Sequence, residues 1–419
     1  MLSKFRRFPQ WQKTVYVMFV AQLMTAIGFS TVHPFLPLYV ESLGARSSLS
    51  IELLAALVFS GQALAMMIAS PLWGSLADRY GRKLMVQRSM FGAAAAVFLM
   101  AFVTSAEQLV ILRTMQGLIS GTLSAANALV ASVAPRERTG YAMGLLQTGL
   151  FGGIALGPLL GGVVADVFGF SEAFILTAVL LTASGLLVWK GVHEEFVPDS
   201  VVGPGSGGLS GWRTILAEPG VKPAYLLRFL TGFARSFIWP FIPLFILSLL
   251  AAGAAVNTFT GVVVGLGSLM STITALYLGR LGDEVGHRRV LVIASLASGI
   301  LYVLQFGVTE AWQLLLLQLL AGAAFGGIIP SVSALLARYG GAVAAGRVYG
   351  LDNSVAAAAR SAAPLLGAGL VHWFGLRSIF MGAGILFLGT AVIAARWLPH
   401  AEQAEIPTSA HAGESRPNP

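Results

Sequence analysis

Charged side chains interrupt long apolar stretches of this sequence, and these are the residues that could do chemistry within them. Arg113, Arg235 and Arg360 each lie inside such a stretch. A guanidinium at the centre of a membrane costs roughly 2.5–3.5 kcal/mol on insertion scales, so it is expected to face a cavity, water or a partner. This pattern indicates the binding and movement of ions or polar solutes.

Arg113 is the sharpest candidate for proton coupling, because it could set the charge of a nearby acid or base. Two titratable groups are candidates for carrying the proton. His33 lies well inside the first apolar stretch, and its ordinary pKa of about 6.5 suits proton exchange. Glu41 flanks the first outer loop. Alternatively, Arg113 is a structural residue near Glu107, and His33 only satisfies a carbonyl freed by Pro34.

Arg235 and Arg360 lie in later apolar stretches that should line a central cavity. Their charges would suit an anionic or zwitterionic ligand, including a lipid headgroup. Pairing within the membrane, for instance of Arg360 with an acid of the same half, is the equal alternative.

Polar amides and aromatic rings inside the apolar stretches are further candidates for the cavity wall, because a buried amide needs a partner or water and aromatic rings suit amphipathic ligands. The alternative for the rings is contact with lipid. The candidates are Gln22, Phe29, Gln62, Asn127, Gln147 and Trp239.

The elements that must position these residues are membrane-spanning helices. Hydrophobic residues make up 56% of the chain and charged residues only 11%, and each apolar stretch is long enough to cross a hydrocarbon core of roughly 30 Å. We predict an all-α membrane protein with twelve spans, at about 14–38, 51–74, 84–104, 108–132, 140–165, 170–190, 224–249, 257–279, 290–308, 312–337, 347–371 and 376–398.

The basic residues predict the orientation. Of those outside the spans, only Arg46 and Arg377 fall on the side opposite the N-terminus. Cytoplasmic loops carry the excess of Lys and Arg. We therefore expect a multi-pass protein of the plasma or inner membrane with both termini in the cytoplasm.

The chain repeats itself. The segment Gly74–Lys83 returns as Gly279–Arg288, 205 positions later, and Pro34–Tyr39 returns as Pro240–Phe245, 206 positions later. Such offsets indicate two homologous six-helix bundles related by an axis along the membrane normal. The expected organisation is an N-terminal bundle, a cytoplasmic linker, a C-terminal bundle and a disordered cytoplasmic tail, at residues 1–196, 197–223, 224–398 and 399–419.

The fifth span carries a run of small residues. Gly153, Gly157 and Gly161 share one helical face and permit close approach of another helix. Pro158 removes a backbone hydrogen bond and is expected to bend the span. Gly162 completes the motif. The run could serve packing alone or also seal the protein against leak.

Three motifs resemble those of the major facilitator superfamily, and within it the twelve-span drug:proton antiporters. They are Gly74–Lys83 after span two, Arg113–Gly117 in span four and Gly153–Gly162 in span five. The resemblance covers about residues 14 to 398. It implies two bundles around a central cavity, proton coupling at Arg113 and, from the third motif, export rather than import.

The resemblance also implies a gating loop after span two, in which Asp78 latches the cytoplasmic side. Asp283 is its repeat partner, although His287 replaces the first base of the repeated motif. A topology anchor with a tight turn is the alternative. The loop residues are Gly74, Asp78, Arg79, Gly81, Arg82 and Lys83.

Other classes of function lack their motifs. The sequence has no phosphate-binding Gly-Lys-Ser/Thr loop, no His-Glu-x-x-His segment and no cysteine. We expect no catalytic site, metal, cofactor or nucleic-acid partner, with the proton gradient as the energy source and a monomer as the working unit. The expected function is proton-coupled efflux of amphipathic, drug-like molecules by alternating access. A lipid or glycolipid flippase and a membrane protein that binds without transport are the alternatives.

Overall fold

The computed structural model describes residues 9–135, 138–194, 220–251, 253–340 and 345–398. The predicted linker lies almost wholly outside these ranges, and the predicted tail lies outside them, so both stay predictions. Regular structure in the described residues is helical. In the N-terminal half the helices are α2 (Gln10–Val32), η1 (His33–Phe35), α3 (Leu36–Leu43), α4 (Ile51–Tyr80), α5 (Arg82–Met100), α6 (Ala106–Ile119), α7 (Thr122–Val133), α8 (Thr139–Val167) and α9 (Phe170–Gly191).

The C-terminal half repeats this order. Its helices are α11 (Val221–Ile238), α12 (Ile242–Leu249), α13 (Val256–Val285), α14 (His287–Gln305), α15 (Ala311–Phe325), α16 (Ile328–Gly340), α17 (Ala345–Phe374) and α18 (Ser378–Trp397).

Twelve crossings account for these helices, as predicted. Ten stretches within the described residues are long and apolar enough to span a membrane by themselves. The other two crossings are α5 and the interrupted pair α6–α7. The first and seventh crossings are also interrupted, at Pro34 and Pro240, because proline lacks the N–H that a continuous helix needs.

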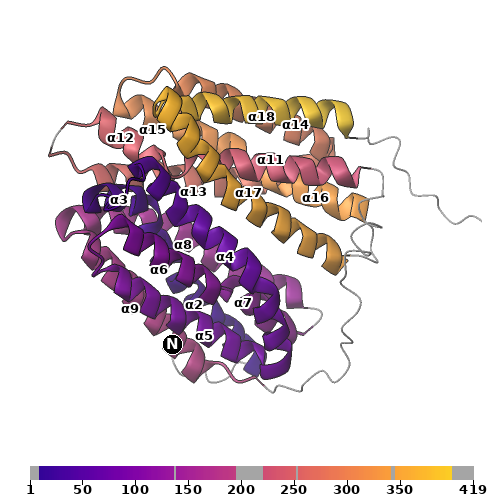
Figure 1. The fold of residues 1–419 in the computed structure, drawn as a ribbon. Coiled ribbons are helices and arrows are strands. Elements are labelled where there is room, and N and C mark those ends of the chain that lie inside the picture. Colours follow the sequence, from indigo (N-terminus) through magenta and orange to yellow (C-terminus); the bar gives the residue numbers. More distant parts are fainter. Residues whose placement is uncertain (1–8, 136–137, 195–219, 252, 341–344, 399–419) are drawn as a thin grey trace, which may run out of the picture.

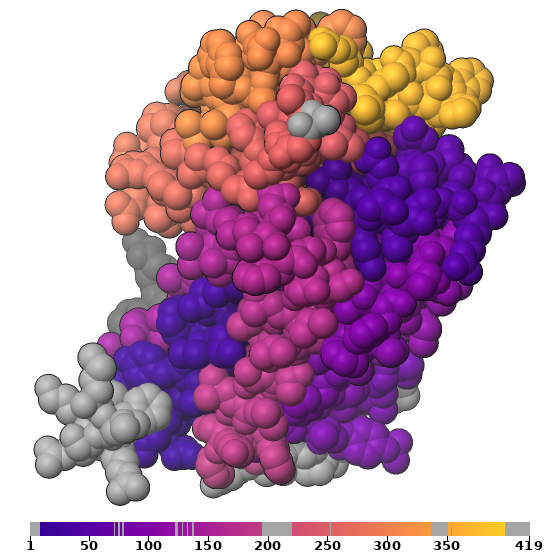
Figure 2. Space-filling model, turned by 90° about the vertical axis from the view of Figure 1, so that its left-hand side faces the viewer, coloured from indigo at the N-terminus to yellow at the C-terminus, as the bar shows by residue number. Residues whose placement is uncertain are grey.

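The two bundles lie against each other and form a V (Figure 1). We call the end that carries Gln10, Gly81 and Gly286 the inner end, following the orientation predicted from the basic residues. The bundles meet at the opposite, outer end, near α3 and α12, and diverge towards the inner end (Figure 1). In a view of the outer end, atoms of the N-terminal half lie directly against atoms of the C-terminal half (Figure 2).

Each bundle has its own apolar core, and the cores join at the outer end. The C-terminal core includes Leu38 and Ala56, which belong to the N-terminal half. Within the N-terminal bundle, buried hydroxyls tie α2 to α9: Ser184 and Thr25 share a 2.8 Å hydrogen bond, and Thr177 Oγ1 donates to the Gly28 carbonyl at 3.0 Å. Large apolar side chains such as Leu276 and Trp373 are exposed, as expected of surfaces that contact lipid.

Candidate functional site

A cavity opens inside the C-terminal bundle, between α11, α13, α14 and α15. It is small: its volume is about 60 Å³, which is room for a few water molecules at about 10–15 Å³ each. The wall combines one cation, aromatic rings, hydroxyls and an amide with apolar side chains. Its residues are Arg235, Ile238, Trp239, Ile242, Val263, Val264, Gly267, Ser268, Ser271, Tyr302, Gln318, Gly322 and Phe325.

Arg235 is the charge in this wall. Its guanidinium carbon lies 4.4 Å from the centre of the Phe325 ring, a cation–π contact. Among the described residues no carboxylate lies within ion-pair distance of Arg235, whereas Arg228, two turns earlier on α11, has one. The cavity therefore presents a half-buried cation beside aromatic rings, which suits the anionic end of an amphipathic ligand.

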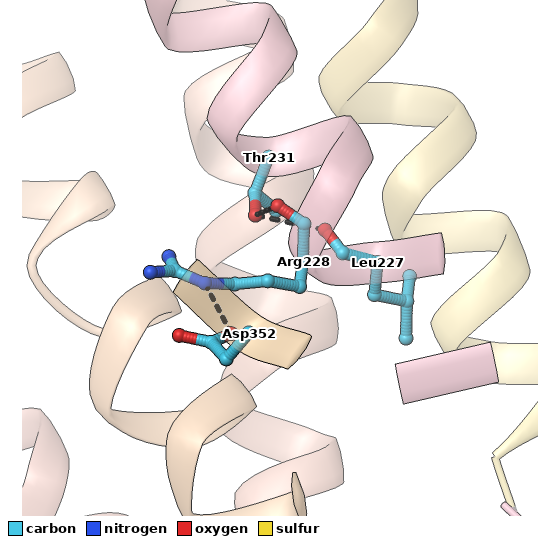
Figure 3. A network of polar contacts seen from close by, with 4 residues as sticks. All are labelled: Leu227, Arg228, Thr231 and Asp352. Carbon is cyan, nitrogen blue, oxygen red and sulfur yellow. Dashed lines mark hydrogen bonds and ion pairs between the residues drawn. The ribbon is translucent and has the colours of Figure 1, made fainter. Parts of the chain in front are cut away.

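The ion pair of the C-terminal half lies closer to the inner end. Arg228 Nε on α11 donates to Asp352 Oδ1 on α17 over 2.7 Å, and both side chains are about 15% exposed (Figure 3). The sequence left open two roles for Arg360, a ligand contact or a pair with an acid of the same half. In the structure Asp352 pairs with Arg228, and Arg360 lies exposed on α17.

Arg113 is the most deeply buried charge among the described side chains of the N-terminal half. Its side chain is 2% exposed, and its Nη1 donates to Gln116 Oε1 over 2.7 Å. Its Nε and Nη2 have no acceptor among the described residues. Arg113 and Glu107 form no ion pair among the described residues. Glu107 Oε1 accepts hydrogen bonds from the backbone N–H groups of Arg46 and Ser47, each at 2.8 Å. Arg113 therefore keeps two donors for water or a ligand.

His33 lies where the two halves touch. Its ring packs edge-on against Phe59 at 4.9 Å and against Trp239 at 5.3 Å, between ring centres. Trp239 follows His33 by 206 positions, so this contact joins equivalent positions of the repeat. Glu41, the other proton candidate, lies exposed in the last turn of α3.

The predicted cavity residues divide into two groups. Arg235 and Trp239 line the C-terminal cavity. The others lie in other places, and their role in the cavity stays a prediction. Gln22 is 2% exposed and its Oε1 has no donor among the described residues, while Phe29 packs on the apolar core. Gln62, Asn127 and Gln147 are partly buried on α4, α7 and α8.

The gating loop forms the turn between α4 and α5. Gly81 has φ 96°, the same value as its repeat partner Gly286, a conformation that favours glycine. The first N–H groups of α5, at Arg82 and Lys83, donate to Glu194 at 3.0 and 2.7 Å. The side chain of Asp78 lies outside the described residues, so its latch role stays a prediction.

In the repeated loop, the acid Asp283 contacts His287, one turn later, over 3.1 Å. The role of Glu194 at the start of α5 was not predicted. Glu194 follows span six, and no local pattern indicates that it meets the first turn of a helix more than a hundred residues earlier.

The glycines of α8 bring helices into backbone contact. A Cβ on Gly157 would lie 2.5 Å from the Ser30 Cβ of α2, and one on Gly162 would lie 2.5 Å from the Asn257 carbonyl of α13. Gly153 and Gly161 likewise press against Ala26 and Thr31 of α2. Pro158 lies inside the helix, and its carbonyl touches Gly261 of α13. The small residues therefore pack α8 on both halves at once.

Known proteins match the whole architecture. The family model described as Major Facilitator Superfamily matches residues 18–223 and 224–417. Two relatives called multidrug resistance protein MdtG are each 35% identical. The Dickeya zeae protein (strain Ech586) aligns over 374 residues, covering 88% of this chain and 91% of its own. The Enterobacter lignolyticus protein (strain SCF1) aligns over 386 residues, 91% of either chain.

Solved structures share the fold at low sequence identity. A bacterial homologue of the human lysosomal transporter Spinster, in an inward-facing and occupied conformation, has a TM-score of 0.77 at 13% identity, over 96% of this chain and 100% of that one. The human organic anion transporter MFSD10 has a TM-score of 0.68 at 19% identity, over 92% of this chain and 100% of that one. Together with the family match and the relatives, this identifies the chain as a membrane transporter of the major facilitator superfamily, with multidrug efflux proteins among its relatives.

Proposed function

We propose that this protein exports amphipathic small molecules in exchange for protons, by alternating access of a central site. The relatives named for multidrug resistance support the substrate class and the direction. Two bundles that meet at one end and diverge at the other support the rocking motion (Figure 1).

The observation that carries proton coupling is the environment of Arg113. A guanidinium that is 2% exposed and has two unpaired donors is costly to keep in an apolar bundle. Its retention is explained if the charge acts on a titratable group that approaches it during the cycle. His33 is the candidate on the N-terminal half nearest the junction of the bundles.

Flux into proteoliposomes under an imposed pH jump tests the proposal. We expect a fluorescent amphipathic substrate to accumulate against its gradient only when the pH gradient has the correct sign, and Arg113→Ala to abolish this accumulation. Accumulation that ignores the pH gradient would contradict antiport. Saturable binding without accumulation would show a binding protein instead.

A second candidate, transport of anionic amphiphiles including lipids, is favoured by Arg235. Its guanidinium lies in the cavity wall over Phe325 and faces no carboxylate among the described residues. Flux of a matched set of anionic, zwitterionic and cationic dyes with one ring system separates the two candidates. Scrambling of a headgroup-labelled lipid in the same vesicles would identify a flippase.

A further inference from the structure

Asp166 joins the two halves at the outer end. It lies in the last turn of α8, and its carboxylate reaches the first turn of α13 in the other bundle. Oδ1 accepts hydrogen bonds from the backbone N and the side-chain Nδ2 of Asn257, at 3.2 and 2.8 Å, and Oδ2 accepts one from the backbone N of Thr258 at 2.6 Å.

The bonded N–H groups are ones that a helix cannot satisfy by itself. The first turn of any α-helix has N–H groups without an acceptor, and the aligned peptide dipoles place partial positive charge there. A carboxylate that accepts from two of them forms charge-assisted hydrogen bonds, which are about twice as strong as neutral ones. Asp166 of one bundle therefore caps a thirty-residue helix of the other.

The α8 and α13 backbones are in direct contact next to Asp166, and we call this contact the α8–α13 seam. Gly162, one turn before Asp166, touches the backbone of Asn257 and Thr258, and Gly261 touches the carbonyl of Pro158. The seam between α8 and α13 is thus backbone against backbone and ends at the Asp166 carboxylate. Parting the bundles at the outer end must break all three hydrogen bonds and expose the first turn of α13.

Within the part of the chain that the structure describes, the repeat has no copy of this contact. The position equivalent to Asp166 is His372, 206 residues later, near the end of α17. The helix equivalent to α13 is α4, and it is capped by its own Ser50, whose Oγ accepts from the Leu53 N–H over 3.3 Å. The carboxylate at the α8–α13 seam is therefore a feature of one seam rather than a consequence of the shared fold.

We propose that Asp166 is the latch that holds the outer end closed and sets the balance between inward-open and outward-open states. This rests on the proposed alternating access. In the outward-open state the carboxylate is released to water and the first turn of α13 loses its cap. Weakening the latch therefore shifts the population towards outer opening and inner closure.

The chain offers matched reporter positions for a test. It has no cysteine, so introduced cysteines carry the only labels. Ser42 and Ser248 are exposed, equivalent in the repeat and located at the outer ends of α3 and α12. Tyr80 and Val285 are exposed, equivalent at an offset of 205 and located at the inner ends of α4 and α13. Spin labels on each pair report the outer and inner separations by double electron–electron resonance.

We expect Asp166→Ala to raise the ratio of outer-open to outer-closed molecules about tenfold, in line with the loss of charge-assisted hydrogen bonds. The Ser42→Cys/Ser248→Cys distance should lengthen while the Tyr80→Cys/Val285→Cys distance shortens. Asp166→Glu should restore part of the closed population, and Asp166→Asn should give an intermediate ratio. Glu172→Ala is the matched control, because Glu172 is an exposed carboxylate at the same end, in the first turn of α9.

Unchanged distances in Asp166→Ala, or an effect of equal size in Glu172→Ala, would overturn the latch. Both distances lengthening together would indicate loosened packing and would also overturn it. Flux separates this result from the proposed function. If Asp166→Ala shifts the two distances in opposite directions but the wild type shows no pH-driven flux, the latch is supported and proton coupling is contradicted. If the wild type shows pH-driven flux but Asp166→Ala leaves both distances unchanged, only the latch is contradicted.

Discussion

The two halves of this transporter share one scaffold and divide its polar groups differently. Where the N-terminal bundle buries Arg113 beside Gln116, the C-terminal bundle has Gln318, which donates to Gln305 over 3.0 Å. Where the C-terminal bundle places Arg235 in a cavity, the equivalent N-terminal residue is Phe29, packed on the apolar core. Equivalent positions of the shared scaffold therefore carry a charged side chain in one half and a neutral one in the other.

This comparison suggests a division of labour. The cation of the N-terminal half is buried with unpaired donors and lies outside the cavity wall, as suits a coupling residue. The cation of the C-terminal half lines the cavity, as suits a residue that contacts the solute. Variants that copy one half into the other test this division directly.

The largest effect is expected from Arg113→Gln, which gives the N-terminal half the residue found in the C-terminal half. Proton-driven flux should fall at least about tenfold, within the usual range of coupling between sites. Downhill flux without a pH gradient should persist, because the variant keeps the cavity. Equal losses of driven and downhill flux would mean that Arg113 supports folding or binding instead. Gln318→Ala is the control for a change in the cavity wall: its flux can fall, but the ratio of driven to downhill flux should stay that of the wild type.

A smaller effect is expected from Arg235→Gln. The affinity for an anionic amphiphile should weaken about tenfold, corresponding to roughly 1–2 kcal/mol for a charge-assisted hydrogen bond, while a cationic analogue should bind as before or better. Tryptophan fluorescence titration measures both, because Trp239 lies in the same wall. Equal weakening for both ligands would place the role of Arg235 in packing on Phe325. Arg360→Gln provides the comparison with a cation outside the cavity wall.

The ion pair between α11 and α17 should matter for stability more than for coupling. Asp352→Asn removes the carboxylate from a half-buried Arg228, and we expect a loss of about 1–3 kcal/mol, between the values for exposed and buried pairs. Thermal unfolding in detergent measures this loss. Arg228→Met combined with Asp352→Leu should recover part of it. A loss of pH-driven flux with unchanged stability would instead make Asp352 part of the coupling machinery.

The smallest effect is expected at Glu107, in the loop region where α6 begins. Hydrogen bonds from Ser47 lower the pKa of its carboxyl from 4.5 to about 2. A lowered pKa means that the loop gains stability from the carboxylate above about pH 4.5 and loses it as the pH falls towards 2. Glu107→Gln should therefore loosen the loop, measured by limited proteolysis, and leave the flux profile between about pH 5 and 8 unchanged. A shifted flux profile would instead place Glu107 in the proton pathway.

The helices could be predicted from the sequence because lipid requires long apolar stretches, and the charged turn at Gly81 recurs at Gly286. Arg235 could be assigned to a cavity because burying its charge in an apolar stretch costs free energy, and Trp239 because its ring is amphipathic. Their neighbour Tyr302 could not, since its place depends on how α14 packs against α13 and α15. The Arg228–Asp352 pair joins residues 124 positions apart, and no local pattern selects that partner over Arg360. Nothing in the sequence around Asp166 indicates its contact with α13, because that contact depends on how the two bundles pack.

Besides the first and seventh crossings, the fourth and tenth are broken at equivalent points, and this has a mechanical consequence. The fourth crossing stops at Ile119 and resumes at Thr122 across Gly121, with φ 143°. The tenth stops at Phe325 and resumes at Ile328 across Gly326, 205 positions after Gly121. We expect each break to act as a joint, at which α7 and α16 change direction while the outer pieces that hold Arg113 and Gln318 keep their shape. We expect backbone amides beside both joints to exchange with deuterium faster than those one turn further out.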